Sequence, residues 1–222
     1  MKYPHAKLLI FSKAPEPGQV KTRLIPALGA TGAAQLYSEL LDACLDMGVS
    51  AQLCPVALCC SPSTAHAHFQ QLQERYRVEL RQQANGDLGR RMSQALQAAL
   101  QHSRAVLLVG ADCPSLCAND LDTALEQLNS GVDVVLGPAR DGGYYLVGMR
   151  THHPGLFENI PWGTHTVLEH TRKRMQEQGL RSFYLPLRSD LDTPADYHTW
   201  QDAGSDRCPI RADEHDPYKS GD

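Results

Sequence analysis

Short runs of apolar residues alternate along the chain with longer stretches in which apolar positions recur at helical spacing. The run at 106–110 shows no polar alternation, which is typical of a strand covered on both faces. Further strands are predicted at 7–12, 55–61, 78–82, 132–138, 144–149 and 181–187. Helices are predicted over 31–48, 63–76, 88–102 and about 164–179, with one that Ser115 or Asn119 caps and that ends near 131, and a last one that begins at Thr193 and Pro194. This order of elements predicts an α/β fold.

The connection before the strand at 144–149 fixes the kind of sheet. Asp141-Gly142-Gly143 forms a tight turn only a few residues after the strand at 132–138. A parallel crossover needs a dozen or more residues, so the strand at 144–149 should return antiparallel. The sheet is therefore predicted to be mixed and mostly parallel.

Composition narrows the class of protein. The chain has 222 residues with 42% hydrophobic and 21% charged residues, which suits a single globular domain over 1–203 followed by a polar tail at 204–222. A net charge of −4 argues against nucleic acid as a partner. No apolar run reaches the roughly 18 residues of a membrane span, and the first residues do not resemble a signal peptide. Seven irregularly spaced cysteines indicate a reducing, cytoplasmic compartment.

A cationic loop follows the first predicted strand. The segment SKAPEPGQVKTRL begins at Ser12 and holds Lys13, Lys21 and Arg23. Such a loop is suited to phosphate oxygens, because Gly18 lets the backbone approach and arginine offers a two-pronged donor. It matches neither a Walker loop nor a dinucleotide-binding turn. A solvated surface loop is the alternative interpretation.

Carboxylates follow several of the predicted strands. Asp112 comes directly after the run at 106–110, Asp141 follows the strand at 132–138, and Asp192 follows the last strand. The carboxyl ends of parallel strands meet at one edge of a sheet, where ligands of α/β proteins bind. Packed carboxylates repel one another unless a cation joins them, so the pattern predicts Mg²⁺ or Mn²⁺ beside a nucleotide. Alternatively, Asp112 is a turn or capping residue and Asp141 serves only the hairpin.

Two further segments carry candidate site residues with competing structural roles. Asp87 can cap the helix at 88–102, in whose first turns Arg90 and Arg91 oppose the helix dipole. A nearby anion or plain solvent exposure explains these two cations equally well. Trp162, in the loop Pro161-Trp162-Gly163, either lines a pocket or holds the loop in place.

Six motifs in order resemble those of a known bacterial family. The segments FSKAPEPGQVKTRL, GDLGRRM, GADCPSL, DGGYYLVG, PWGTHTVLEHT and DLDTPADY are similar to the DUF2064 family, from about Lys7 to Trp200. That family is grouped with glycosyltransferase-A-fold proteins. It is similar to the guanylyltransferase of the coenzyme F420 pathway and, more distantly, to that of the molybdenum cofactor. The resemblance implies a three-layer α/β/α sandwich with a nucleotide at the carboxyl edge of a mixed sheet.

The resemblance also implies roles for individual residues. Asp112 and Asp192 stand where the superfamily has its two metal-binding carboxylates. The nucleotide would contact the first loop (Ser12, Lys13, Gly18, Lys21 and Arg23) and the segment with Gly86, Asp87 and Gly89, which corresponds to one that passes near the nucleobase. The carboxylate motif departs from a full Asp-x-Asp pair because Gly110 takes the partner position, and this leaves the reaction open.

Three functions are compatible with these observations. The first is metal-dependent transfer of a nucleotidyl group from an NTP to a phosphorylated small molecule, with Asp112, Lys21 and Arg23 as catalytic residues. The second is glycosyl transfer from a nucleotide sugar, and the third is nucleotide binding without turnover. The acceptor side would be formed by Asp141, Gly142, Gly143 and Trp162. The nucleobase, the acceptor and the oligomeric state stay open, with a homodimer as one option.

Overall fold

The computed structural model describes residues 1–202, so the polar tail expected at 204–222 lies outside the described residues. The strands are β1 (Ala6–Lys13), β2 (Val56–Ser61), β3 (Glu79–Gln82), β4 (Ala105–Gly110), β5 (Val134–Pro138), β6 (Tyr144–Met149) and β7 (Ser182–Tyr184). The helices are α1 (Ile25–Ser50), α2 (Ala67–Tyr76), α3 (Leu88–Leu100), α4 (Ala118–Asn129), α5 (Val167–Glu177) and α6 (Pro194–Asp202). Short 3₁₀ turns lie at Thr22–Leu24 and Pro154–Leu156. Every predicted strand is present.

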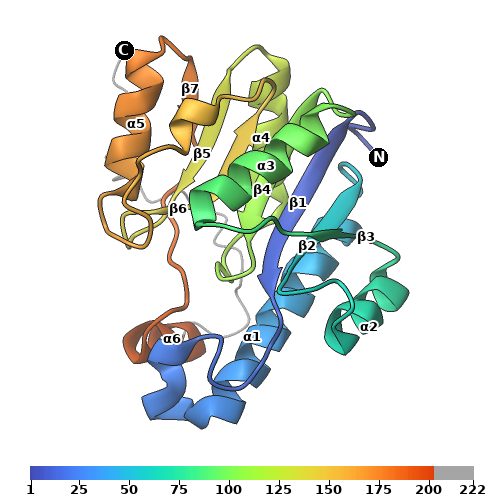
Figure 1. The fold of residues 1–222 in the computed structure, drawn as a ribbon, viewed down its shortest axis with the longest axis vertical. Coiled ribbons are helices and arrows are strands. Elements are labelled where there is room, and N and C mark those ends of the chain that lie inside the picture. Colours follow the sequence, from blue (N-terminus) through green and yellow to red (C-terminus); the bar gives the residue numbers. More distant parts are fainter. Residues whose placement is uncertain (203–222) are drawn as a thin grey trace.

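The strands form one seven-stranded sheet in the order β3-β2-β1-β4-β6-β5-β7 (Figure 1). Strand β6 pairs antiparallel with both β4 and β5, while the other neighbouring strands pair in parallel. The predicted mixed, mostly parallel sheet is therefore confirmed, and the short 141–143 connection is the physical reason for the one reversed strand.

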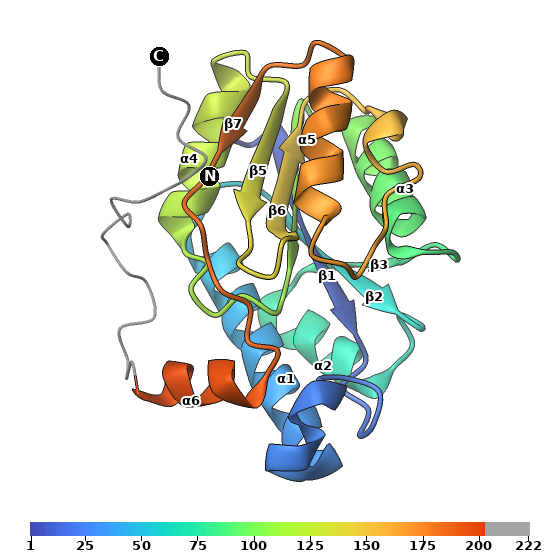
Figure 2. The same ribbon diagram turned by 90° about the vertical axis from the view of Figure 1, so that its left-hand side faces the viewer.

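Helices cover both faces of the sheet (Figures 1 and 2). Side chains of β1 alternate between two cores: Leu8 and Ile10 pack with α1, α2 and α4, whereas Leu9 and Phe11 pack with α3 and α5. This alternation is why the strand reads as an unbroken apolar run. The three-layer α/β/α arrangement follows from this burial of both faces.

None of the helices within residues 1–202 has the length and apolarity to cross a membrane.

Three helix starts differ from the prediction, and one of them is α2, which begins at Ala67 rather than near residue 63. Helix α1 begins at Ile25, but Gly29 (φ 70°, ψ 166°) has a non-helical backbone and kinks it, so the regular helix after Gly29 starts close to the predicted Thr31. Helix α4 is capped by Cys117 rather than by Ser115 or Asn119, and the Asp120 carboxylate accepts the Cys117 amide hydrogen at 3.0 Å. The start of α4 matters because Asp120 also forms a buried ion pair.

A separate small core fixes α6 at the amino-terminal part of α1. Leu24, Leu36, Leu40 and Leu191 are buried there, with Tyr197 and Trp200 of α6 packed against them. In Figures 1 and 2, the segment that leaves β7 runs past the end of the sheet and leads into α6 beside α1. The last part of the described chain is thereby brought to the carboxyl ends of β1 and β4.

We predict that Asp120→Ala strongly destabilises the fold. The Arg188 guanidinium lies 2.8 Å from the Asp120 carboxylate, and both side chains are at least nine-tenths buried. Removing one partner leaves a buried charge without compensation, which costs about 3–5 kcal/mol in the free energy of unfolding. Urea denaturation followed by circular dichroism measures this loss.

Asp122→Ala is the matched control, since Asp122 lies on the same helix and pairs with Lys2 at the surface. Its expected cost is about 1 kcal/mol or less. Equal losses in the two variants would show that the Asp120–Arg188 pair contributes no more than a surface contact.

Candidate functional site

A candidate site lies at the carboxyl ends of β1 and β4, where the sheet order reverses. The chain leaves β1 toward β2 on one side, while β4 lies on the other side of β1. Crevices of α/β proteins form at such a switch point. A cavity of about 470 Å³ opens here, a volume within the range of small-molecule sites.

Most residues singled out in the sequence line this cavity. Those at its wall are Ser12, Lys13, Lys21, Arg23, Asp112, Asp141, Gly143, Trp162 and Asp192. Gly18, Gly86, Asp87, Gly89 and Gly142 are outside the lining. The sheet edge therefore brings together residues that are far apart in the sequence, as the strand ends suggested.

The Lys21 ammonium joins the two carboxylates that were expected to hold a metal. Its Nζ lies 2.7 Å from Oδ1 of Asp112 and 2.8 Å from Oδ1 of Asp192. The lysine side chain is only 3% exposed, and its backbone is left-handed (φ 47°, ψ 41°). Burial alone would lower the pKa of Lys21, but the charges of Asp112 and Asp192 outweigh it and raise the pKa. The ammonium therefore stays charged.

The segment after β7 positions Asp192 through the residue beside it. Leu191 is buried in the core between α1 and α6, and its amide donates to the Asp112 carbonyl at 3.0 Å. The Asp196 carboxylate accepts the amides of Asp192 and Thr193 at the start of α6. Both anchors fix the backbone of residue 192 next to the end of β4. Arg23 is more loosely placed, with its guanidinium 3.8 Å from Asp192 and its side chain largely exposed.

Asp190 is a cavity residue that the sequence analysis did not assign to the site. Burial raises its pKa to about 7, and the neighbouring carboxylates of Asp141 and Asp112 add to the effect. The sequence signal was its place two residues before Asp192, with the buried Leu191 between them. In an extended segment, this alternation turns both carboxylates away from the core.

Glycines near the cavity have packing roles. A Cβ on Gly89 would collide with the indole of Trp162, and a Cβ on Gly142 (φ 87°) would collide with the backbone of His165. The Gly142 carbonyl accepts the Leu168 amide, so the 141–143 turn holds the start of α5. Gly18 (φ 82°) has open space around it. At Gly89 and Gly142 the missing Cβ allows close packing irrespective of any ligand, whereas at Gly18 only the positive φ favours glycine.

Asp87, Asp141 and Ser12 each form a hydrogen bond that supports the local fold. Asp87 caps α3 as predicted, because its carboxylate accepts the Arg90 amide at 2.8 Å. The Asp141 carboxylate accepts the Gly143 amide at 2.8 Å, yet the residue still faces the cavity. The Ser12 hydroxyl donates to the Cys59 carbonyl.

The other side of the cavity is apolar and aromatic. The Trp162 ring stacks on Phe157, with centroids 6.5 Å apart, and meets Tyr144 edge-on at 6.2 Å. Trp162 therefore both holds its loop and contributes to the cavity wall. This side is formed by Phe11, Leu88, Met92, Leu108, Tyr144, Val147, Trp162 and Val167.

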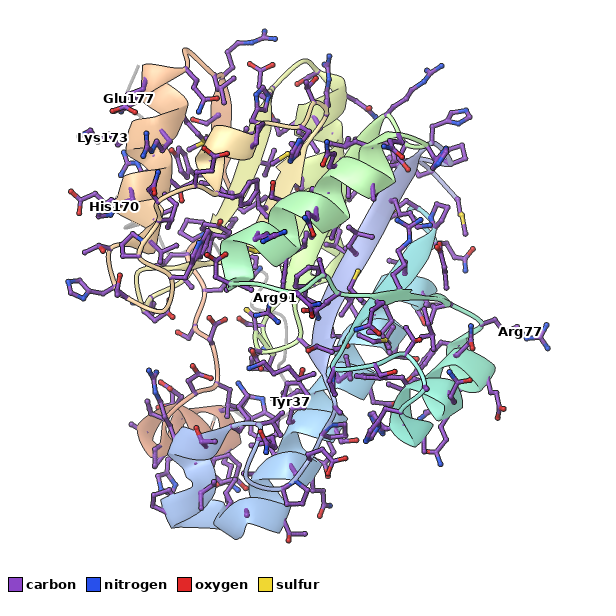
Figure 3. All side chains as sticks on the ribbon, viewed as in Figure 1. Tyr37, Arg77, Arg91, His170, Lys173 and Glu177 are labelled. Atoms are coloured by element: carbon purple, nitrogen blue, oxygen red, sulfur yellow. The ribbon has the colours of Figure 1, made fainter. Side chains whose placement is uncertain are left out.

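Gln83 and Arg91 also line the cavity and were not assigned to the site from sequence. The buried Gln83 amide donates to the carbonyls of Ser12 and Cys59, both at 2.8 Å. Its oxygen accepts from the Arg91 guanidinium at 3.0 Å. Figure 3 shows Arg91 on α3 and Tyr37 on α1, and both residues belong to the cavity wall. Only the opposition of Arg91 to the helix dipole hinted at this placement in the sequence.

A metal site made of protein side chains alone is absent from the described part of the chain. Among residues 1–202, no group of three or more His, Cys, Asp or Glu side chains is arranged to hold a metal ion. The carboxylates of Asp112 and Asp192 converge on the Lys21 ammonium. Any divalent cation here would need further oxygen ligands from water or from a bound molecule.

Comparisons with known proteins agree with this architecture. A solved structure from Desulfovibrio desulfuricans, described as a "putative nucleotide-diphospho-sugar transferase", is 32% identical, with a TM-score of 0.83 over 91% of this chain and 89% of the other. A 4-diphosphocytidyl-2C-methyl-D-erythritol synthase from Anaerococcus prevotii is 10% identical, with a TM-score of 0.61 over 90% and 96% of the two chains. The glucosyl-3-phosphoglycerate synthase of Mycobacterium tuberculosis, solved with Mn²⁺ and UDP, is also 10% identical, with a TM-score of 0.54 over 88% and 75%. The last two likenesses establish the fold alone.

The family comparison is more specific. No curated protein matches the sequence. The family model described as "Uncharacterized protein conserved in bacteria (DUF2064)" matches residues 44–164, which is more than half of the chain and includes the Asp112 and Asp141 motifs. The chain therefore belongs to the DUF2064 family, as the resemblance of its motifs to that family suggested.

Proposed function

We propose that this chain is a metal-dependent nucleotidyltransferase that transfers a nucleotidyl group from an NTP to a phosphorylated small molecule. The observation that carries the proposal is the buried Lys21 ammonium shared by Asp112 and Asp192 at the cavity wall. In this arrangement, the two carboxylates that we propose bind a metal are in direct contact with the lysine that we propose binds phosphate. Transferases with a related fold, including the cytidyl-type synthase above, support the reaction class.

The donor set suits Mg²⁺ or Mn²⁺. Mg²⁺ is commonly held by one or two carboxylates together with substrate phosphates, and Asp112 and Asp192 supply two carboxylates that already share one cation. Burial and the charges of Asp141 and Asp112 raise the pKa of Asp190, so a cation bound beside these carboxylates would also favour the charged form of Asp190. When bound, the metal would neutralise charge on the phosphates of the leaving group.

The remaining steps belong to residues of this chain. Lys21 and Arg23, with Lys13 and the backbone near Gly18, would bind the triphosphate. Asp141 and the 142–143 backbone would orient the acceptor, and Trp162 would exclude water from it. An acceptor phosphate oxygen then forms a bond to the α-phosphorus, while the bond from that phosphorus to the β-phosphate oxygen breaks and pyrophosphate leaves.

Glycosyl transfer is the second candidate, and the position of Asp141 favours it. Asp141 faces the same cavity as Asp112 and acts electrostatically on Asp190, so a sugar hydroxyl could reach it. The 32% identical protein is described as a nucleotide-sugar transferase. In that case the products would be a glycoside and a nucleoside diphosphate.

The compartment is part of the same proposal. The six cysteines within residues 1–202 are free thiols, and burial raises the pKa of Cys59 and Cys113 to about 12. Protonated, buried thiols are compatible with cytoplasmic conditions, where we propose that the protein acts.

A thermal-shift panel of NTPs and nucleotide sugars, each with and without Mg²⁺ or Mn²⁺, tests the proposal. A bound ligand raises the melting temperature by mass action, so no acceptor is needed. A metal-dependent shift with an NTP supports nucleotidyl transfer, whereas a shift with nucleotide sugars only supports glycosyl transfer. An absence of any shift would contradict both.

We predict that Asp112→Asn abolishes turnover while the chain stays folded, because Asp192 still pairs with Lys21. The substitution keeps the size of the side chain but removes the charge that a metal ligand requires. Pyrophosphate release or nucleoside diphosphate release, according to the panel, measures the loss. Asp122→Asn, at the surface pair with Lys2, should retain full activity. Near wild-type turnover in Asp112→Asn would reduce Asp112 to a turn residue.

We predict opposite effects of Lys21→Met on two ligands. Without the ammonium, Asp112 and Asp192 lose their shared counter-ion, so Mn²⁺ alone should bind more tightly. NTP affinity should fall about ten- to a hundredfold, the range of a lost charge-assisted hydrogen bond. Calorimetric titrations with MnCl₂ and with each NTP separate the effects.

Lys2→Met is the control for the change in net charge, because Lys2 pairs with Asp122 away from the cavity. It should leave both affinities unchanged. If Lys21→Met weakens Mn²⁺ binding as well, the two carboxylates are not the metal ligands.

A further inference from the structure

The first turn of α3 presents a mixed apolar and cationic face to the cavity. Arg91 and Met92 follow Leu88 by three and four residues, so each lies near Leu88 on the helix surface, and all three line the cavity. Leu88 is 38% exposed, and Met1 is the only other large hydrophobic side chain exposed within residues 1–202. An exposed leucine at a cavity wall is suited to an apolar ligand surface.

Arg91 is held in place by uncharged oxygens. The amide group of Gln83 donates hydrogen bonds to two main-chain carbonyls, one in β1 and one in β2, and its oxygen accepts from Arg91. The Arg91 Nε donates to the Asp87 carbonyl at 3.4 Å. In the part of the chain that the structure describes, Arg91 forms no ion pair. Through Gln83, the strands β1 and β2 therefore orient the Arg91 guanidinium, whose charge is available to a ligand.

The surroundings of Arg91 differ from those of the other cavity cations. Lys21 and Arg23 lie beside carboxylates, whereas the neighbours of Arg91 along α3 are Leu88 and Met92. A planar ring fits against such apolar side chains, and its polar edge can meet the guanidinium. A phosphate group would leave the apolar wall without a partner.

We propose that Arg91, held by Gln83, selects the nucleobase by donating two hydrogen bonds to an edge with two adjacent acceptors. Guanine presents N7 and O6 in this way, and cytosine presents N3 and O2. Adenine places an amino group beside N7, and uracil separates its carbonyl oxygens by an N–H group, so both pair poorly with the planar fork. The inference rests on the proposed nucleotide site.

The test is calorimetric titration of the full chain with GTP, CTP, ATP and UTP, each with Mg²⁺. The four ligands share the triphosphate, so the ratio of affinities within one variant reports the base alone. The wild-type chain should bind either GTP or CTP at least about tenfold more tightly than ATP and UTP, and the preferred one identifies the base. Arg91→Ala should remove most of this ratio.

Two variants sharpen the experiment. Arg91→Lys keeps the charge without the two-pronged geometry, so it should lose the ratio while still binding the triphosphate, and it provides the test if Arg91→Ala does not fold. Arg90→Ala is the matched control, because Arg90 is the exposed neighbour on α3 and lies outside the cavity lining. It should keep the wild-type ratio.

The outcomes separate the two proposals. A wild-type preference for ATP or UTP, no preference at all, or an unchanged ratio in Arg91→Lys would overturn the role of Arg91 and leave the nucleotide site standing. If none of the four nucleotides binds the wild-type chain, the proposed function fails, and the inference fails with it.

Discussion

The ion pairs of the Lys21 ammonium with Asp112 and Asp192 are the interaction on which the rest of the site depends. They join the loop after β1, the end of β4 and the segment before α6, although residues 21 and 192 are 171 positions apart. Without this cation, two carboxylates would face each other at one edge of a sheet and repel. Leu191, beside Asp192, is buried in the core between α1 and α6, so the same segment that brings Asp192 to the lysine also leads into α6.

The cavity is divided into two chemically different sides. Lys21, Arg23 and the aspartates form a charged side, whereas Leu88, Met92, Trp162 and their neighbours form an apolar one. A ligand that uses both sides must carry charge at one end and a ring at the other. Nucleotides have this construction. The division arises from the fold, because the segments that follow β1, β4, β5 and β7 supply Lys21, Arg23 and the aspartates. The strands themselves, α3 and the loop before α5 supply the apolar wall, to which α3 adds the cation of Arg91.

The fold could be predicted from the sequence more completely than the contacts within the site. Continuous apolar runs and the short 141–143 connection were sufficient for the strands and for the reversed β6, since both signals are local. The turn of α1 before Gly29 was missed, because its apolar residues Ile25 and Leu28 pack in the small core with α6, which is a contact between distant parts of the chain. From the sequence, Lys21 was predicted to bind phosphate, whereas Asp112 and Asp192 were predicted to bind a metal. These are separate roles. That one ammonium contacts both carboxylates depends on side-chain placement across the whole fold. Gln83 was missed for a similar reason, because its role comes from carbonyls of two other strands.

The balance of charge at the site indicates why Lys21 alone does not complete it. Burial raises the pKa of Asp190 to about 7, the charges of Asp141, Asp112 and Asp192 add to the effect, and Lys21 opposes it. Among the described residues, the cavity wall holds these four aspartates and four cations, which are Lys13, Lys21, Arg23 and Arg91. A cation bound beside Asp190 would favour the charged form that burial disfavours. A nucleoside triphosphate by itself would add negative charge beside these aspartates. Under the proposed function, a triphosphate that binds together with a divalent cation would add less of that charge, which is why the proposal couples the metal to the nucleotide.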